Sequence, residues 1–325
     1  MHIGPIYAKR GEVIVAFFNL EKQMGPVFLK EDSSAEIQLT ALQELAKTAD
    51  HFLAEQLEEE IKCVRAGIHG EDAIKFELQN SHIPMVILHD LYLEYEGLSA
   101  QIDYLIITRY HQFVLECKNL YGNIEINSNG DFIRTMSFGK KVRKEGIYSP
   151  ITQNRRHLEL IKQIRSAEKK NFLTKTLFEK NFYDNYRAIV VLANPKTVLN
   201  ARYAKKEVRD QVLRADQLAE YIRKTDASSR AEPSNEKEMR ALAEFFLARH
   251  QQPPVDYTEK FRAKIPSLAI QSAELTQTSE APSQILCPKC GAVMVKRQAS
   301  KGPNAGKEFY GCPNFPKCRG IVNIV

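Results

Sequence analysis

Three kinds of segment are missing from this sequence of 325 residues, and each absence excludes a class of protein. No stretch approaches the roughly 18 consecutive apolar residues of a membrane-spanning helix, so we expect no contact with a membrane. The apolar run at residues 13–18 is short and lacks a small-residue cleavage site, which argues against a signal peptide and predicts a cytoplasmic protein. No helicase motif or glycine-rich Walker loop is present, so any ATP-driven step would belong to a separate chain.

Positive charge is concentrated in two segments. The chain is 43% hydrophobic and 26% charged, which is ordinary for a soluble protein of two or three domains. The net charge of +6 resides in residues 285–325, which hold seven basic residues and one acidic residue. In the neutral remainder, residues 31–60 hold nine acidic residues and one basic, whereas residues 134–165 hold nine basic and two acidic. The two basic segments predict a polyanionic partner.

The N-terminal part of the chain has the pattern of an acidic amphipathic helix. Ser33 and Glu36 form a capping-box pattern, and apolar residues then recur at three- or four-residue spacing from Leu42 to Val64. The acidic residues form the outer face of this helix. We interpret that face as a surface for packing or for a protein partner.

Glycines, prolines and apolar periodicity divide the rest of the chain. We expect Gly67 and Gly70 to end the first helix and a second helix to begin at Glu71. Strands are predicted in residues 85–126 and 187–195, and helices at 150–165, 214–224 and 236–249. The predicted domains are an N-terminal helical segment (1–63), an α/β domain (64–200), a helical extension (201–250), a linker rich in Pro, Ser, Thr and Gln (251–284) and a four-cysteine tail (285–325).

The four-cysteine tail has the spacing of a zinc site. Cys287 and Cys290 form one pair, and Cys312 and Cys318 form a second pair after a gap of 21 residues, so four thiolates could bind one tetrahedral Zn²⁺. A tail this polar has too little apolar surface to fold without the metal. The alternative is two disulfides, which the reducing conditions of a cytoplasm disfavour.

The phrase CPKCG…FYGCPNFPKC resembles the zinc ribbons at the C-termini of type IA topoisomerases over residues 286–320, although the second cysteine pair is wider than CxxC. The resemblance implies binding of single-stranded DNA. Aromatic rings would stack on bases and basic side chains would contact phosphates. Alternatively, at least one ring, Tyr310 or Phe315, packs the small core. The candidate DNA contacts here are Lys296, Arg297, Phe309, Tyr310 and Phe315.

A second candidate site lies in QIDYLIITRYHQFVLECKN, residues 101–119, where two apolar strands contain Asp103, Glu116 and Lys118. If these strands pair as a hairpin through residues 109–112, position 103 lies opposite roughly position 118. Alternate residues share a face of a strand, so Glu116 and Lys118 project together. This register would bring Asp103 beside both of them.

The three charged groups suit phosphodiester hydrolysis. Asp103 and Glu116 offer hard oxygen ligands for Mg²⁺ or Mn²⁺, and Lys118 could orient or activate the attacking water. The alternative is a Glu–Lys salt bridge with Asp103 at a strand edge. The spacing of the charges alone favours the salt bridge.

The surrounding segments favour the catalytic set over the salt bridge. Gly-Glu at 70–71, QID at 101–103, VLECKNLYGNI at 114–124 and SPITQ at 149–153 together resemble the nuclease-related domain family of the PD-(D/E)xK superfamily, over about residues 64–194. The resemblance implies an α/β fold, a restriction-endonuclease-like mixed sheet flanked by helices on both faces. It also implies a catalytic set composed of Glu71, Asp103, Glu116, Lys118 and Gln153.

The sequence departs from the family pattern at two positions. Ile102 replaces the proline of the superfamily's name, and Tyr104 stands where the family has a histidine. His157, one turn after Gln153, is a candidate DNA contact. Six further basic residues could border a DNA groove or lie in a solvated loop. These are Lys140, Lys141, Arg143, Lys144, Arg155 and Arg156.

We therefore predict a metal-dependent DNA nuclease with an accessory zinc ribbon. Two alternatives are a DNA-binding module that does not cleave and a partner-recruiting protein that acts through its acidic helix. The complete catalytic set favours the nuclease, because a module that only binds DNA has no evident reason to keep all five residues.

Overall fold

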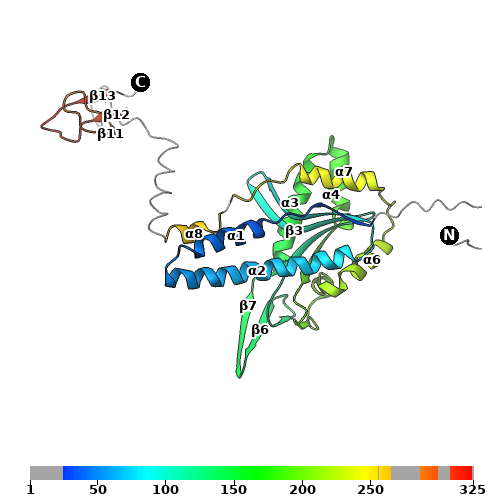
Figure 1. Ribbon diagram of the computed structural model, residues 1–325. Helices are drawn as coiled ribbons and strands as arrows, with labels where there is room; N and C mark the ends of the chain where they lie inside the picture. The colour runs from blue at the N-terminus through cyan, green and yellow to red at the C-terminus, as the bar shows by residue number, and fades with distance from the viewer. Residues whose placement is uncertain (1–24, 255, 265–285, 299–307, 324–325) are drawn as a thin grey trace, which may run out of the picture. The chain divides into compact units, whose positions relative to one another are not determined.

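Figure 1 shows the computed structural model of the chain, which describes residues 25–254, 256–264, 286–298 and 308–323. The described residues up to Thr258 belong to one compact unit, and those from Glu259 onward belong to a second. Within the segment predicted as a linker, residues 259–262 form the short helix α8, Glu259–Arg262. Residues 265–284 of that segment, and the apolar run at 13–18, lie outside the described ranges.

A mixed six-stranded sheet forms the centre of the first unit, with the strand order β1-β2-β3-β4-β8-β10. Neighbours β2, β3 and β4 pair antiparallel, whereas β1 joins β2, and β8 joins β4 and β10, in parallel. The predicted mixed sheet is thus confirmed, with an edge strand in the N-terminal segment that was predicted as helical. The strands are β1 Pro26–Lys30, β2 Met85–Tyr95, β3 Leu98–Thr108, β4 Gln112–Lys118, β8 Tyr186–Leu192 and β10 Val212–Arg214.

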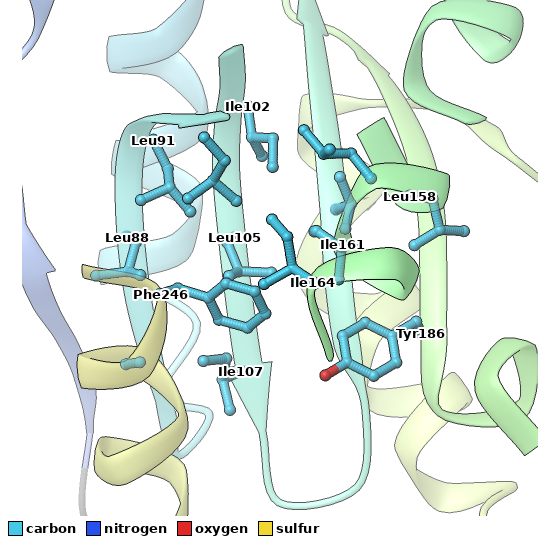
Figure 2. Packing of buried hydrophobic residues seen from close by; sticks show 14 of the residues in the cluster. Leu88, Leu91, Ile102, Leu105, Ile107, Leu158, Ile161, Ile164, Tyr186 and Phe246 are labelled. Carbon is cyan, nitrogen blue, oxygen red and sulfur yellow. The ribbon is translucent and has the colours of Figure 1, made fainter. Parts of the chain in front are cut away.

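Helices cover both faces of this sheet, as predicted. Residues of α3, α4 and α7 pack on one face, and residues of α2 and α6 pack on the other. None of the helices in the described ranges combines the length and apolarity needed to cross a membrane. The helices of this unit are α1 Ser34–Ala46, α2 His51–Gln79, α3 Pro150–Ala167, α4 Phe172–Asn185, α5 Lys206–Arg209, α6 Leu218–Ala227 and α7 Glu236–Leu247. Figure 2 shows the first face, where Ile164 of α3 and Phe246 of α7 lie over Leu105 of β3.

A second, four-stranded sheet has the order β7-β6-β5-β9. Its strands are β5 Asn123–Ile126, β6 Phe132–Phe138, β7 Lys141–Ile147 and β9 Leu199–Asn200. Strands β6 and β7 form a hairpin that projects from the unit as an arm (Figure 1). Gly139 has a φ of +59° in the two-residue turn, a conformation that glycine adopts without steric cost. Lys141, Arg143 and Lys144, for which the sequence left a DNA groove and a solvated loop open, therefore lie in strand β7.

The second unit contains a small antiparallel sheet, β11-β12-β13. Its strands are β11 Val295–Gln298, β12 Glu308–Gly311 and β13 Ile321–Asn323. The buried side chains of this sheet and its loops are Cys287, Met294 and Cys312, so two candidate metal ligands form most of its core. This arrangement confirms the predicted four-cysteine ribbon.

Helix α2 runs without interruption through Gly67 and Gly70, so the predicted break at these glycines is wrong. The break comes earlier, at residues 47–50, where the Asp50 carboxylate accepts the Leu53 N–H at 2.8 Å and caps α2. Gly70 is glycine because α2 approaches the end of β4 closely. A Cβ atom at Gly70 would lie 2.6 Å from Asn119 Cβ and 3.1 Å from Cys117 Sγ.

The two helical glycines therefore predict opposite substitution effects. Gly67 is exposed, with no atom within 4 Å of an added Cβ, so Gly67→Ala should raise the free energy of unfolding by about 1 kcal/mol. Gly70→Ala should instead lower it by about 1–3 kcal/mol, because the methyl group must displace packed atoms. Urea unfolding monitored by circular dichroism measures both. A Gly70→Ala variant as stable as Gly67→Ala would contradict the close approach of α2 to β4.

Candidate active site and candidate zinc centre

The predicted acidic site lies where strands β3 and β4 separate. Their pairing ends at Tyr104 opposite Leu115, while residues 116–118 continue along β4 and pair with β8. At this fork the Asp103 carboxylate accepts the backbone N–H of Cys117, with Oδ2 2.6 Å from the nitrogen. A side-chain oxygen thus takes the place of a strand carbonyl.

The hairpin register differs from the predicted one by two residues. The Thr108 N–H donates to His111 O at 2.9 Å, so the turn is tighter than the predicted loop of residues 109–112. Position 103 consequently falls at the level of Glu116, and not of Lys118. The error of two residues leaves every side chain on its predicted face, because side chains alternate with a period of two.

Beside the fork, the alternation of side chains between the two faces of the sheet inverts in strands β2 and β3. Leu88 and Leu91 both face the α3 side of the sheet, as do Ile102 and Leu105, so the alternation of side chains inverts between them. Asp90 has a φ of +50° at this point, and its carboxylate accepts hydrogen bonds from Ser34 N and Gln101 Nε2. The inversion places Asp103 at the fork and turns Tyr104 toward α2.

Glu116 and Lys118 project together, as predicted, and Lys118 also contacts Gln153. Lys118 Nζ lies 2.6 Å from Glu116 Oε1 and 3.3 Å from Gln153 Oε1 in the first turn of α3. Ser149 caps this helix and Pro150 begins it, as the sequence predicted. The buried Asn154 holds α3 on the sheet, since its Nδ2 donates to the carbonyl groups of Val114 and Ile189 at 2.8 Å each.

The second oxygen of Glu116 has no hydrogen-bond partner among the described residues. Glu116 is only 2% exposed, and its Oε2 lies 3.6 Å from His157 Nδ1, which also has no hydrogen-bond partner there. Burial and the nearby Lys118 lower the pKa of His157 to about 4, so this imidazole is neutral at pH 7. His157 is also buried, which places it against Glu116 and not on a surface for DNA.

Burial and mutual repulsion act on the carboxyl groups of the site. Part of Asp103 reaches solvent, yet burial of its carboxyl, followed by repulsion from Glu116 and Glu71, raises its pKa well above the ordinary value. Burial also raises the pKa of Glu116, with Lys118 opposing and Glu71 adding to the effect. Burial is the main cause for both groups, and the positive charge of Lys118 does not offset it.

These groups fit a hard divalent cation. Mg²⁺ keeps several water ligands and needs only one or two carboxylates, which Asp103 and the free Oε2 of Glu116 could provide. Among the described residues, the cysteine cluster is the one group of three or more potential ligand side chains placed to hold a metal by themselves.

Glu71 is held by a histidine that sequence reasoning missed. His89 Nε2 lies 2.8 Å from Glu71 Oε2, and His89 Nδ1 lies 3.1 Å from Glu31 O. Both partners are acceptors, so the ring must carry a proton on each nitrogen to satisfy them. Burial opposes this charge, but the hydrogen bonds to Glu71 and Glu31 outweigh it and raise the His89 pKa.

His89 also packs against Tyr104, the position at which the sequence departs from the family pattern. The two residues are directly opposite in the β2–β3 register, and their rings stack with centroids 4.6 Å apart. Tyr104 OH donates to Glu71 O at 2.9 Å. His89 and Tyr104 thus both contact Glu71, through its carboxylate and its backbone carbonyl respectively.

The basic residues predicted to contact DNA are exposed but lie on two different elements. Lys140, Lys141, Arg143 and Lys144 belong to the arm, whereas Arg155 and Arg156 lie on α3. Arg143 pairs with Glu145 at 3.0 Å, and the Arg156 guanidinium lies 5.8 Å from the centre of the Tyr148 ring.

The four cysteine thiols of the ribbon converge on one point. Sγ–Sγ distances are 3.7 Å for Cys287–Cys318 and 3.4 Å for Cys290–Cys312. Four sulfurs around a tetrahedral Zn²⁺, each at about 2.3 Å, would lie about 3.8 Å apart. The cysteines are unbridged, so the disulfide alternative finds no support. The N–H of Ala292 lowers the pKa of Cys290 to about 6, whereas burial raises the pKa of Cys312 to about 12.

The predicted aromatic contacts of the ribbon divide into core and surface. Tyr310 packs against the cysteine cluster, as the alternative interpretation allowed, while Phe315 is 60% exposed. Lys296 forms an ion pair with Glu308 at 2.7 Å. A hollow is lined by Arg297, Phe309, Phe315 and Arg319, the last of which was not among the predicted site residues.

Two family models match the chain. Residues 66–193 match the model described as a nuclease-related domain, and residues 284–325 match the model described as a topoisomerase DNA binding C4 zinc finger. No match was found among curated proteins or among solved structures. Both resemblances inferred from the sequence are thereby confirmed for these two segments.

The charge of His89 predicts a dependence of stability on pH. Its folded-state pKa lies above the ordinary value of 6.5, so its stabilising effect is complete below about pH 6.5 and is lost as the pH rises through the raised pKa. We expect His89→Gln to lower the free energy of unfolding by about 1–3 kcal/mol at pH 6 and by less at pH 9. Urea unfolding across this range measures the difference. The exposed His69, substituted in the same way, is the control, and a His89→Gln effect independent of pH would contradict the charged ring.

The cysteine geometry predicts one zinc per chain. Elemental analysis after zinc-replete expression should find about one equivalent, and Cys312→Ser should remove most of it, because the site then lacks a buried ligand. Cys63→Ser, which alters an exposed cysteine outside the cluster, is the matched control. Full zinc content in Cys312→Ser would show that the metal is bound elsewhere.

Proposed function

We propose that this chain, in which a nuclease-related domain precedes a topoisomerase-type zinc ribbon, is a metal-dependent DNA nuclease. The observation that supports this most is the fork between β3 and β4. There a buried Glu116 with an unpartnered oxygen adjoins Asp103, whose pKa is raised, and Lys118, which contacts Gln153. Such a set is typical of a site that binds a cation and a phosphate.

Each residue has a chemical role in this proposal. Asp103 and Glu116 would hold Mg²⁺ or Mn²⁺, which when bound would supply positive charge to the phosphate and acidify a water. Lys118 is fixed at one side by Gln153 and would donate hydrogen bonds to the attacking water or to the phosphate oxygens. Glu71, held by His89, is available to orient a water on the α2 side.

The DNA would contact surfaces outside the fork. The basic side chains of the arm and of α3 would bind phosphates without regard to sequence, so affinity would fall as salt rises. The ribbon would add a second contact through Arg297, Phe309 and Phe315, with a preference for single strands.

We further propose a cytoplasmic location. Glu58 and Glu59 lie on the exposed side of α2, and this acidic surface would be the contact for a protein partner.

A DNA-binding protein without nuclease activity is the main alternative. The same contacts would then be a structural ion pair between Lys118 and Glu116, with Asp103 serving only as the acceptor for Cys117 N–H. The two functions differ in whether they require Asp103 to be charged. Catalysis requires the carboxylate, whereas the hydrogen bond to Cys117 needs only an oxygen.

Asp103→Asn therefore tests the nuclease. The asparagine oxygen can still accept from Cys117 N–H, and loss of a charge repelled by Glu116 and Glu71 should leave the thermal midpoint unchanged or slightly higher without Mg²⁺ or Mn²⁺. Cleavage of linear and closed-circular DNA in Mg²⁺ should fall at least about 100-fold, as expected for loss of a group acting in the transition state.

Two variants complete this experiment. Lys118→Ala should also abolish cleavage, and Asp184→Asn, an exposed position on α4, should change neither cleavage nor stability. An Asp103→Asn protein that is destabilised yet cuts at the wild-type rate would exclude the proposed site. Cleavage of closed circles by the wild-type protein would identify an endonuclease.

A further inference from the structure

Two aromatic rings near the turn of the arm are in contact with each other and exposed to solvent. Tyr121, in the loop after β4, is 51% exposed, and Phe138, at the end of β6, is 58% exposed. Their ring centroids are 5.9 Å apart with an interplanar angle of 36°. Neither ring contributes to a described hydrophobic core cluster, so packing of the fold does not account for them.

Cationic side chains share the face of the arm that contains Phe138. The β6–β7 register places Lys141 opposite Phe138 and Arg143 opposite Met136, and directly opposed residues project on the same side of a hairpin. Glu145 is the only acidic residue on β7 and is already paired with Arg134 and Arg143. An aromatic surface bordered by positive charge fits a polyanion that also offers flat rings.

Tyr121 is held against β6 without any ligand. Arg134 Nε donates to Tyr121 O at 2.6 Å, and Tyr121 OH donates to Ser137 O at 3.3 Å. Gly122 has a φ of +98°, and a Cβ atom there would collide with the Thr135 carbonyl, so the loop lies directly against β6. A surface that needs no reorganisation loses less entropy on binding.

The ring pair is also close to the candidate active site along the chain. Tyr121 follows Lys118 by three residues, and consecutive Cα atoms are 3.8 Å apart, so the two Cα atoms are separated by at most about 11 Å. A strand whose phosphate lay at Lys118 would bring its adjoining nucleotides to this loop.

We propose that Tyr121 and Phe138, with Lys141 and Arg143, form a stacking site for unpaired nucleotides next to the scissile phosphate. Every base has a π-face, and aromatic rings combined with cations bind single strands with little regard to sequence. Bases inside a duplex are stacked on one another and do not present that face. The inference rests on the proposed function for the position of the cut, and it names single-stranded or locally unpaired DNA as the substrate class.

Binding by the full-length protein without Mg²⁺ or Mn²⁺ tests this site separately from cleavage. Fluorescence anisotropy would compare a labelled thymidine 12-mer with a duplex of equal length. We expect Tyr121→Ala/Phe138→Ala to weaken single-strand binding at least about fivefold, the lower end for loss of one stacked base, and duplex binding less than twofold. Tyr203→Ala/Phe172→Ala, two exposed aromatics on other elements, is the matched control and should bind as the wild type does.

Two further variants separate stacking from loss of structure. Tyr121→Phe/Phe138→Tyr keeps both rings and should keep wild-type affinity, whereas Tyr121→Leu/Phe138→Leu keeps apolar volume and should bind as weakly as the alanine variant. Photocrosslinking of a 12-mer containing 5-iododeoxyuridine should label the peptide with Tyr121 or Phe138, which separates this site from the ribbon.

Three results would overturn the stacking site: unchanged single-strand affinity in the alanine variant, equal losses for single strand and duplex, or crosslinks confined to the ribbon. Failure of the nuclease proposal looks different. In that case the ring variants would still lose single-strand binding, while the wild-type protein would cut no DNA in Mg²⁺.

Discussion

The hydrogen bond from Cys117 N–H to the Asp103 carboxylate is the contact on which the candidate site depends. Strands β3 and β4 separate at this point, and a buried N–H without an acceptor would cost about 1–3 kcal/mol. The Asp103 carboxylate is the acceptor for this N–H. It lies at a position where burial makes a negative charge unfavourable. An oxygen acceptor is enough to stabilise the fork, so the charge of Asp103 is a further feature that this hydrogen bond does not explain.

The charged groups around the fork come from four separate elements. Glu71 comes from α2, Asp103 from β3 and Glu116 from β4, while the compensating cations are Lys118 at the end of β4 and the imidazolium of His89 on β2. Gly70 makes this convergence possible, since α2 can approach Cys117 and Asn119 only without a side chain there. Burial outweighs these cations at Asp103 and Glu116, whose pKa values are raised.

Local patterns predicted the parts of this site that depend on local geometry. The alternation along β4, the Ser149–Pro150 helix start and the cysteine spacing all appear in the structure as expected, because each involves residues near in sequence. Long-range features were not predictable in this way. The contacts 71–89 and 103–117 depend on strand register and on the left-handed Asp90. Gly70 was misread because a glycine needed for close approach and one that ends a helix look alike in a sequence.

The environment of Glu116 bears on the choice between a structural ion pair and a catalytic group. A buried ion pair repays its desolvation only when the remaining lone pairs are satisfied, and apolar residues of similar volume often stabilise a core as well or better. Glu116 satisfies one oxygen through Lys118 and leaves the other beside a neutral His157. As a structural device this arrangement is costly, since an unpaired buried oxygen stabilises nothing. If Glu116 is instead a ligand of a cation, its Oε2, which has no hydrogen-bond partner among the described residues, is the oxygen available to the ion.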